Sequence, residues 1–389
     1  MSNARVLISK GKDPYLTTMT ALRSSALPNL KGKKILIKPN AARLASPGDG
    51  VTTHPLVVLA IIDYLKERGV NYITIGEGCM FGVDAREAFR VTGMEGIAIK
   101  AGVELLDIDQ SGPLEMTIPE AKLLKKIKVP AILKDFDVII SVPVMKTHMH
   151  TQVTLSIKNM KGLLWRREKA RLHHLRSNKK ITGGHKALDY AISEMATILF
   201  PHIAIIDGTV GMEGMGPAYG SPKEMGIVLV SRNPLSADAV ASRLMGFVPD
   251  KIPHLRLSAE RGLGEIQLQN IAVEPEDYLK WENPFEPPPS EFSIPYPDVM
   301  VYDEGACSAC LSTLIVFLKK YHSKLNPYYL DDKKIHIGIG KNLDRCPEGT
   351  LLIGNCTSKK KKRGIFIQGC PPVASQIMNT LTPLTPFKR

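Results

Sequence analysis

The sequence lacks several patterns that identify common protein classes. Nowhere do roughly 18 apolar residues follow one another, and the first residues contain no apolar run of signal-peptide length. No GxxxxGK[ST] segment occurs, which argues against a P-loop nucleotide site. Aromatic residues make up only 6% of the chain, which leaves little surface for stacking nucleic-acid bases. These absences predict a cytoplasmic protein that has no membrane partner.

Cysteine is nearly absent from the first 300 residues and concentrated near the end. Only Cys79 lies in the first part, whereas five of the six cysteines lie in the last 83 residues. In a large intracellular chain, this concentration indicates metal or redox chemistry rather than a disulfide scaffold. Cys79 is expected to be a structural thiol.

Positive charge is in excess, but two segments carry the excess. The chain has 51 Lys and Arg residues against 38 Asp and Glu, a net charge of +13. Residues 158–186 hold ten basic residues and one acidic residue, and residues 359–363 hold five basic residues. The remainder has 36 basic and 37 acidic residues. The first basic segment fits a solvated loop, a lid over an anionic substrate or a nucleic-acid surface, and the scarcity of aromatic residues disfavours the last.

The chain divides at a proline-rich stretch. Residues 283–297 contain six prolines, too many for a helix or a central strand, and predict a linker. The linker separates an α/β domain, residues 1–282, from a smaller cysteine-bearing α/β domain, residues 298–389.

The first domain alternates short apolar runs with helical patterns. The runs that predict strands are Lys34–Lys38, Asn71–Ile75, Glu104–Ile108, Asp137–Val142, Ile203–Ile206 and Ile227–Val230. The apolar spacing predicts helices over Leu56–Arg68, Asp84–Val91, Lys186–Leu199 and Ser236–Met245. This alternation predicts a mostly parallel sheet with flanking helices, which binds ligands beyond the carboxyl ends of its strands. The tail predicts helices over Ser308–Lys324 and Ala374–Leu381 and strands over Lys334–Ile339 and Leu351–Ile353.

A cluster of basic side chains follows the predicted strand Asp137–Val142. If the next residues stay extended, Lys146, His148 and His150 point to one side, because side chains alternate along a strand. Such a group suits an anionic ligand, a carboxylate or a phosphate, with His148 available for proton transfer near neutral pH. The alternative is a pair of loop histidines beside a solvated surface.

Further residues are expected to join this corner. In the helical turn that follows, Thr154, Lys158 and Lys161 share a face. Lys38 and Asn40 come directly after an earlier strand, so their position places them at the same edge of the sheet.

A glycine-rich segment, residues 205–220, supplies two carboxylates. It does not match a dinucleotide fingerprint, because Pro217 and Pro222 disfavour the required helix. Asp207, at the end of an apolar run, and Glu213 are candidates for an acid/base pair or a cation site. A structural turn that carries two solvated carboxylates is the alternative.

The tail has the most specific chemical signal. Cys307 and Cys310 form a CxxC pair, and Cys356 and Cys370 each follow a glycine within two residues. Four thiolates of this kind are what a 4Fe–4S cluster needs. Zinc is one alternative, although zinc ribbons usually present two CxxC pairs, and cysteines that bind no metal are the other. Cys346 is a candidate substitute for one of the four ligands.

Three of these motifs resemble one known family. Lys38-Pro39-Asn40, the run from Val144 to Gly162 and the run from Asp207 to Pro217 are similar, in this order, to the domain of unknown function 362 proteins of archaea and bacteria. The resemblance covers roughly residues 33–250 and adds Asn159 to the expected ligand-binding residues. It implies an iron–sulfur-associated protein and brings no established reaction.

These observations lead to two functional hypotheses. The first is an iron–sulfur oxidoreductase that receives electrons from a donor protein and passes them to an anionic substrate. Its expected catalytic residues are Lys146, His148, Asp207 and Glu213, and its expected substrate-binding residues are Lys38, Asn40, His150, Lys158, Asn159 and Lys161. The second hypothesis is a metal-stabilised protein that binds RNA or an anionic cofactor without turnover.

Overall fold

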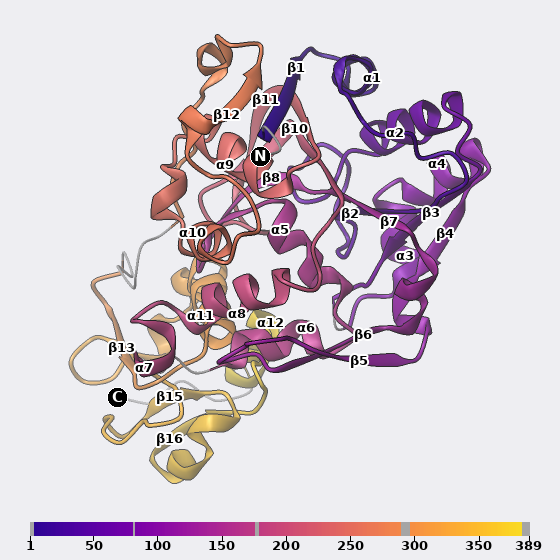
Figure 1. The fold of residues 1–389 in the computed structure, drawn as a ribbon. Coiled ribbons are helices and arrows are strands. Elements are labelled where there is room, and N and C mark those ends of the chain that lie inside the picture. Colours follow the sequence, from indigo (N-terminus) through magenta and orange to yellow (C-terminus); the bar gives the residue numbers. More distant parts are fainter. Residues whose placement is uncertain (1–3, 81, 176–178, 289–295, 383–389) are drawn as a thin grey trace. The chain divides into compact units, whose positions relative to one another are not determined.

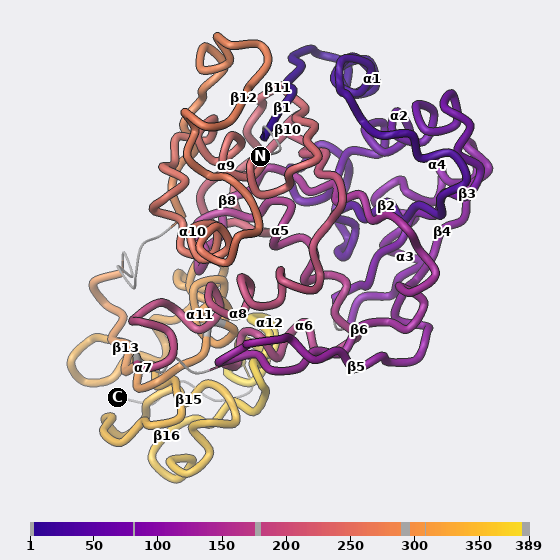
Figure 2. The backbone as a smooth tube through the Cα atoms, viewed as in Figure 1, coloured from indigo at the N-terminus to yellow at the C-terminus, as the bar shows by residue number. Residues whose placement is uncertain are grey.

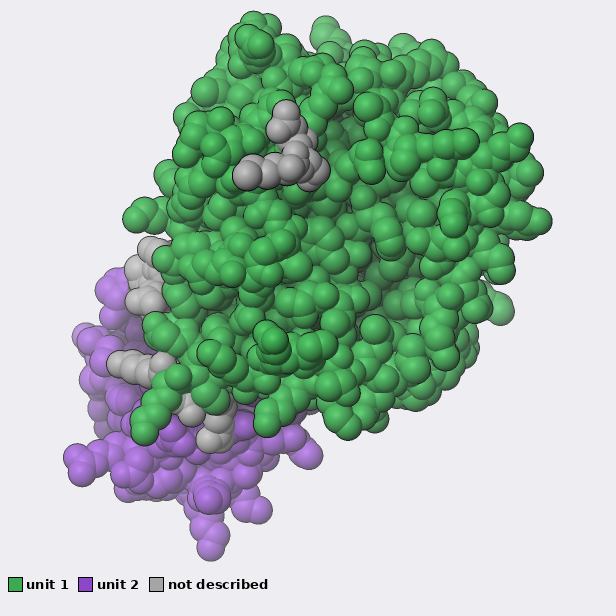
Figure 3. Space-filling model, in the orientation of Figure 1, with its two compact units in different colours: residues 1–172, 177–288 green, residues 173–176, 289–389 purple. Residues whose placement is uncertain are grey.

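The computed structural model describes residues 4–80, 82–175, 179–288 and 296–382 (Figure 1). It consists of two compact units, which Figure 3 distinguishes by colour: Met1–Leu172 with Ser177–Pro288, and His173–Arg176 with Pro289–Arg389. Residues 289–295 of the predicted linker lie outside the described residues. The preceding stretch packs on the first unit, because the N–H groups of Asn283 and Phe285 donate to the carbonyls of Leu244 and Met245.

The first unit contains a ten-stranded sheet with the main order β12-β1-β11-β10-β7-β2-β3-β4, and β8 and β9 extend it beside β10. Its strands are β1 (Ala4–Lys10), β2 (Lys34–Pro39), β3 (Tyr72–Glu77), β4 (Glu104–Asp107), β7 (Val138–Val142), β8 (Val144–His148), β9 (Gln152–Thr154), β10 (Ile203–Glu213), β11 (Ser221–Ser231) and β12 (Ile271–Glu274). A separate hairpin pairs β5 (Pro113–Thr117) with β6 (Lys126–Pro130).

Most neighbouring strands are parallel. Strands β4, β3, β2, β7 and β10 follow one another in parallel, and β11 is antiparallel to both β10 and β1. This arrangement confirms the predicted α/β class with a mostly parallel sheet. The expectation that Asp207 ends a strand is wrong, because β10 continues to Glu213 and forms a hairpin with β11.

Helices cover both faces of this sheet. The helices of this unit are α1 (Pro14–Ser24), α2 (Pro55–Glu67), α3 (Ala85–Val91), α4 (Met94–Ala101), α5 (Ser156–Asn159), α6 (Glu168–Arg171), α7 (Lys179–Thr182), α8 (Ala187–Ala196), α9 (Pro234–Leu244) and α10 (Pro253–Glu260). Figure 1 shows α1, α2 and α4 grouped on one side, where they share an apolar core with alternate residues such as Ile35, Ile37, Ile73 and Ile75. Helices α5 and α9 contact β7, β10 and β11 and pack on each other.

This arrangement of strands fixes the position of β8 and α5, which carry the predicted basic residues. Pro143 separates β7 from β8, and both strands run parallel to β10. Figure 2 traces the backbone of β8 and of α5, which lies close behind it in sequence. The carboxyl ends of the parallel strands therefore meet the start of α5 at one edge of the sheet.

The second unit is a smaller α/β structure. Its four parallel strands, in order, are β13 (Val299–Asp303), β14 (Ile335–Ile339), β15 (Thr350–Ile353) and β16 (Gly364–Ile367). Helices α11 (Ser308–Tyr321) and α12 (Ala374–Leu381) share an apolar core with these strands. Among the described helices of the whole chain, none combines the length and apolar character that crossing a bilayer requires.

Candidate functional site

Lys38, near the end of β2, is buried in an ion pair. Its Nζ lies 2.8 Å from Glu77 Oε2 and also donates to Asn159 Oδ1 (2.7 Å) and to the Pro39 carbonyl (2.9 Å). An ammonium group has three N–H donors, and all three are used here. Burial lowers the pKa of Lys38, and the Glu77 carboxylate opposes this effect. Lys38 therefore holds two strand ends together and has no donor left for a ligand.

The amides of Asn40 and Asn159 complete the same network. Asn159 Oδ1 accepts from Lys38 and from Asn40, and its Nδ2 donates to the Lys38 carbonyl and the Ser141 hydroxyl. Asn40 Oδ1 accepts from the N–H of Val144 at 3.0 Å. The donors and acceptors of Asn159 are thus engaged within the protein, so Asn159 fixes α5 against β2 and β7.

Two glycines make room for the buried charges. A Cβ atom at Gly162 would lie 2.6 Å from Lys38 Nζ and 2.9 Å from Glu77 Oε1. A Cβ atom at Gly78 would lie 2.6 Å from Lys169 Nζ. These distances are too short for non-bonded atoms, so any side chain at either position would displace a buried charged group.

Residues 41–54, which we call the strap, connect β2 to α2 along the carboxyl edge of the sheet. At its start, the N–H of Ala41 donates to Glu77 Oε2 at 3.0 Å. At its end, the N–H of His54 donates to Asp207 Oδ2 at 2.7 Å. Two buried carboxylates therefore anchor the two ends of the strap.

Asp207, inside β10, serves as one of these anchors. Its Oδ1 accepts from the N–H and the hydroxyl of Thr209, at 3.0 and 2.6 Å. Burial raises the pKa of Asp207, and the hydrogen bonds from His54 and Thr209 lower it. Asp207 thus orients the backbone that surrounds the site.

Glu213 lies apart from Asp207. Glu213 lies six positions after Asp207 along the strand, which corresponds to about 20 Å in extended backbone. Glu213 Oε2 accepts from the N–H of Glu286 at 2.9 Å and lies 3.1 Å from Lys223 Nζ. The structure does not bring the two carboxylates together as an acid/base pair.

Lys146, in the middle of β8, contacts the strap. Its Nζ donates to the Val51 carbonyl at 2.7 Å. Burial lowers the pKa of Lys146 to about 7, and repulsion by Arg43 and Lys38 acts in the same direction. Among the ion pairs of the described residues, none joins Lys146 or Arg43 to a carboxylate.

Arg43 is a member of the site that the sequence reasoning missed. It lies in the strap, where burial lowers its pKa and Tyr219 opposes this effect. Its charge in turn lowers the pKa values of Lys146 and Lys161, so these three side chains share one region. The available signal was its position, three residues after the Lys38-Pro39-Asn40 motif in a strand-to-helix loop at the carboxyl edge.

Lys158 and Lys161 come from the helical turn that begins with α5. Lys158 Nζ donates to Thr154 Oγ1 at 3.1 Å, although Thr154 ends strand β9 and does not share a helix face with Lys158. Burial lowers the pKa of Lys158 well below its ordinary value, and the charge of Lys161 adds to the shift. Burial also lowers the pKa of Lys161 to about 7, with Arg43 and Lys169 adding to it. We call Arg43, Lys146, Lys158 and Lys161 the cation cluster.

Asp238, a residue of α9, fixes the turn that carries these lysines. Its carboxylate accepts from the N–H groups of Ser156 (2.8 Å) and Ile157 (2.9 Å) and from the Ser156 hydroxyl. These are N–H groups of the first turn of α5, which have no partner within the helix. Burial raises the pKa of Asp238 to about 7, and the three hydrogen bonds oppose this shift.

The two predicted histidines are adjacent. His148 ends β8 and is buried, and His150 lies in the turn that follows. The N–H of His150 donates to His148 Nδ1 at 3.1 Å, and the two rings meet edge to face with centroids 5.7 Å apart. Because His148 Nδ1 accepts this bond, a ring proton in the neutral form lies on Nε2.

Two cations of the first basic segment form ion pairs within the unit. Lys169 Nζ lies 2.6 Å from Asp109 Oδ2, and Arg171 Nε lies 2.8 Å from Glu168 Oε2. Arg166 stacks on the ring of Trp165, 4.9 Å from its centroid. These contacts tie the segment to the fold.

In the second unit, four of the predicted metal ligands follow the ends of parallel strands. Cys307 and Cys310 come after β13, Cys356 after β15 and Cys370 after β16. Parallel strands end at the same edge of a sheet, so these cysteines gather there. We call Cys307, Cys310, Cys356 and Cys370 the cysteine quartet.

Electrostatic coupling indicates how close the members of the quartet lie. A hydrogen bond from the Cys310 thiol lowers the pKa of Cys307 to about 5, and the same bond raises the pKa of Cys310. The charges of Cys356 and Cys370 also raise the pKa of Cys310. All four thiols therefore share one electrostatic environment.

Asn355 joins the two loops that carry Cys356 and Cys370 through its backbone and its side chain. The N–H of Asn355 donates to the Gly369 carbonyl at 2.8 Å, and the N–H of Gly369 donates to Asn355 Oδ1 at 2.9 Å. Gly354, with φ of 93°, would place a Cβ only 3.4 Å from Cys310 Sγ. The glycines thus let the backbone approach the thiols.

The chemistry of the donor set fits a thiolate-bound metal group, but the spacing is not that of a finished coordination shell. Among the described residues, no three Cys, His, Asp or Glu side chains stand at metal-ligand spacing. Cys346 packs in an apolar cluster with Leu343 and Leu352. Burial raises the pKa of Cys79 to about 12, which makes it an unreactive thiol.

A comparison with known protein families identifies the first unit. The family described as "Domain of unknown function (DUF362)" matches residues 35–243, more than half of the chain. The chain belongs to the DUF362 family. The matched region contains the cation cluster, the strap and Asp238, whereas the cysteine quartet lies outside it.

Similar proteins extend this finding without adding a reaction. A thylakoid-associated protein of Synechocystis sp. is 26% identical over 232 residues, which are 60% of this DUF362 chain and 69% of that protein. The solved lactate racemase apoprotein of Thermoanaerobacterium thermosaccharolyticum is 12% identical, with a TM-score of 0.42, over 62% of this chain. A Thermotoga maritima structure is also 12% identical, with a TM-score of 0.31, over 64% of this chain. The DUF362 chain spans 57% and 60% of these two solved chains.

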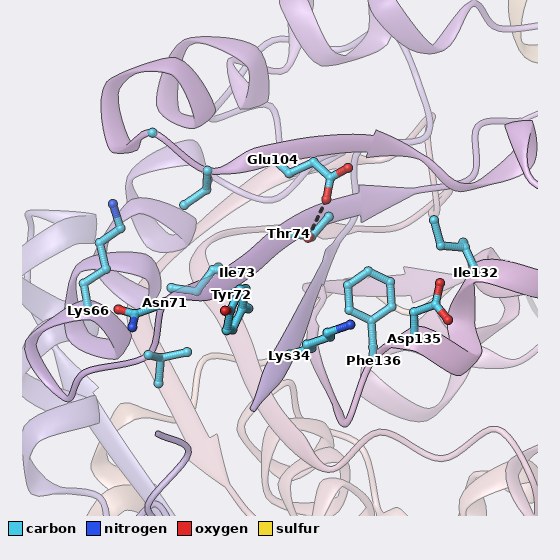
Figure 4. A pocket seen from close by; sticks show the side chains of 13 residues that line it. Lys34, Lys66, Asn71, Tyr72, Ile73, Thr74, Glu104, Ile132, Asp135 and Phe136 are labelled. Carbon is cyan, nitrogen blue, oxygen red and sulfur yellow. Dashed lines mark hydrogen bonds between the residues drawn. The ribbon is translucent and has the colours of Figure 1, made fainter. Parts of the chain in front are cut away.

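A hollow of about 740 Å³ lies elsewhere in the DUF362 unit, and Figure 4 shows its lining. Lys34, Tyr72 and Glu104, which line it, begin β2, β3 and β4, so the hollow lies at the amino ends of these strands. Neither the expected site residues nor the cation cluster lines it. Ligands of parallel sheets bind at the opposite edge, which the cation cluster occupies.

Proposed function

We propose that the DUF362 unit binds an anionic small molecule at the cation cluster. The observation that carries this proposal is the repulsion between Arg43 and Lys146, which the charges of Glu77 and Asp207 offset only in part and which no ion pair among the described residues relieves. Grouping buried like charges costs free energy, and such groups are typical of ligand sites. A bound anion would offset this cost through short, charge-assisted hydrogen bonds.

Sulfate is a suitable probe of this site, because it keeps its charge over the whole neutral pH range. Lys146→Met and Lys161→Met should each weaken sulfate binding about tenfold or more, since each removes a charge-assisted hydrogen bond. Lys126→Met is the matched control, because Lys126 is an exposed lysine paired with Glu115. Calorimetric titration measures all three, and equal affinities would overturn the proposal.

For the second unit, we propose that the cysteine quartet holds a 4Fe–4S cluster, with zinc as the alternative. Four neighbouring thiols on glycine-bearing loops support this assignment. When bound, such a cluster supplies one-electron transfer. The low pKa of Cys307 favours the thiolate form that a metal ligand requires.

Anaerobic reconstitution tests the metal assignment. Iron and sulfide should bind near stoichiometrically, with a broad visible absorption that bleaches on reduction. Cys370→Ser should lose iron, whereas Cys346→Ser should retain it, because Cys346 lies in the apolar cluster. Zinc in place of iron would contradict the redox assignment.

Taken together, these assignments make the protein an iron–sulfur oxidoreductase. It would take electrons from a donor protein and pass them to the anion bound by the cation cluster, with His148 as acid/base. The buried position of His148 at the end of β8 supports this role. The competing function is a metal-stabilised protein that binds RNA or an anionic cofactor without turnover.

We also propose a cytoplasmic location, on the basis of the clustered cysteines alone. The thylakoid association is a property of the Synechocystis relative. Immunodetection in separated membrane and cytoplasmic fractions tests this location.

A further inference from the structure

Lys146 is the most suitable nucleophile of the cation cluster. Its backbone is fixed on both sides, because it pairs with Thr154 of β9 and Met212 of β10. The side chain is 5% exposed, and its Nζ uses one N–H on the Val51 carbonyl. Lys38, in contrast, uses all three donors. Lys146 therefore presents a buried and well-positioned amine with bonding capacity to spare.

An amine becomes nucleophilic when it loses its proton, and the surroundings of Lys146 favour that loss. Burial removes the water that stabilises an ammonium ion, and Arg43 and Lys38 repel a further positive charge. The resulting pKa of about 7 leaves a large neutral fraction at neutral pH. Desolvation beside another cation prepares a lysine for Schiff-base formation.

Arg43 supplies the group that would orient a substrate. A guanidinium is planar and binds a carboxylate through two parallel hydrogen bonds. Arg43 belongs to the same strap as Val51, whose carbonyl holds Lys146. The charge of Arg43 is also the strongest that acts on Lys146, so a molecule whose carboxylate binds Arg43 can present an adjacent carbonyl carbon to Lys146.

We infer that the anionic ligand is a 2-oxo acid and that Lys146 binds its carbonyl carbon as an imine. This inference rests on the proposed anion site. The neutral amine adds to the carbonyl carbon, a C–N double bond replaces the C–O double bond, and the two amine protons leave with the oxygen as water. The step consumes no oxidant and no reductant.

Reductive trapping with pyruvate tests the inference. Cyanoborohydride reduces an imine to a stable secondary amine, so mass spectrometry of the intact chain should show one adduct, which peptide mapping places on Lys146. Lys146→Arg should abolish the adduct. Lys126→Arg is the matched control, because Lys126 is an exposed lysine that is paired with Glu115 and lies outside the cation cluster. Adducts spread over several lysines, or an adduct that persists in Lys146→Arg, would overturn the inference.

Two further measurements separate the role of the carboxylate from that of the amine. Acetone, which lacks a carboxylate, should give little adduct under the same conditions. Arg43→Lys keeps the charge but loses the planar fork, so trapping at limiting pyruvate should fall about tenfold. Equal trapping of acetone and pyruvate would overturn the assignment of Arg43.

Sulfate titration of the same samples distinguishes this inference from the proposed function. Sulfate binding without a pyruvate adduct would overturn the 2-oxo acid and leave the anion site in place. If the folded wild-type protein bound no sulfate and formed no pyruvate adduct, both the anion site and the 2-oxo acid would be overturned.

Discussion

At the scale of single residues, Lys38 and Glu77 are almost wholly removed from solvent, with side-chain exposures of 2% and 0%. Glu77→Gln would leave a buried ammonium ion without its counter-charge. We expect this change to lower the free energy of unfolding by about 3–5 kcal/mol, the usual result of breaking a buried pair. Urea denaturation followed by tryptophan fluorescence measures the loss.

The exposed pair of Lys126 and Glu115 offers a control for this prediction. Glu115→Gln should cost only about 0–1 kcal/mol, because water already screens that pair. If both glutamate substitutions had the same small effect, the structural role of Glu77 would be contradicted.

The lysines of the cation cluster make anion binding depend on pH. Lys146 and Lys161 have pKa values lowered to about 7, so both are largely protonated below that pH and lose their charge above it. We expect sulfate affinity to be highest below pH 7 and to fall as pH rises through this value. Calorimetric titration from pH 6 to pH 8 checks the direction, and a rise in affinity with pH would contradict it.

Residue types were easier to predict than residue roles. Local patterns were enough to predict that two groups of residues gather at strand ends, because each group follows a strand or a helical turn. These groups are the cysteine quartet and the lysines Lys146, Lys158 and Lys161. The pairing of Lys38 with Glu77 could not be read, because the two residues are 39 positions apart. For the same reason local patterns could mark Arg43 only by its position after the Lys38-Pro39-Asn40 motif, and could not show that Lys38 rather than Arg43 forms the ion pair with Glu77.

At the scale of elements, the short helix α5 depends on a carboxylate from another helix. Asp238 has a folded-state pKa of about 7, whereas an unfolded Asp titrates near 3.9. The folded protein therefore holds more protons than the unfolded chain between these values. The stability that Asp238 contributes is present at low pH and is lost as pH rises through about 7.

Asp238→Asn tests this dependence, because it keeps the shape of the side chain and removes its titration. We expect the free energy of unfolding of the wild type to decline between pH 4.5 and pH 8 relative to that of the variant. Urea denaturation at several pH values measures the difference. Parallel pH profiles would contradict the prediction.

The predicted elements that match the structure are those with strong local patterns. Buried parallel strands such as β2 and β7 appear as continuous apolar runs, and α2 has a regular apolar face. The extent of β10 was missed because glycines and prolines in residues 208–222 suggested a loop. The tip of the hairpin requires glycine, because it passes so close to β8 that a Cβ at Gly216 would collide with the Thr147 carbonyl. Long-range pairing, which fixes β1 beside β11 and β12, leaves no local signal.

At the scale of the whole molecule, the net charge of +13 does not describe a uniform basic surface. In the second unit, the described residues outside Lys359–Arg363 carry equal numbers of basic and acidic side chains. In the first unit, Lys169 and Arg171 of the basic segment are ion-paired, and Lys158 is buried. The excess charge is thus partly enclosed in the DUF362 unit, partly exposed there at Arg166, Arg167, Lys180 and Lys186, and otherwise confined to one short segment of the second unit.

This distribution predicts weak binding to RNA. A protein that neutralises Z phosphates of a single strand loses affinity with a slope of about −0.7Z in a plot of log K against log salt concentration. Because Lys158 is buried, Lys169 and Arg171 are ion-paired and few aromatic side chains stand beside the exposed cations, we expect little RNA binding at physiological salt. Filter binding at several salt concentrations measures the slope, with Arg166→Gln and Lys362→Gln as probes of the two basic segments. A steep slope that Arg166→Gln reduces would favour the RNA-binding alternative over the anion site, since Arg166 is an exposed residue on the face of Trp165.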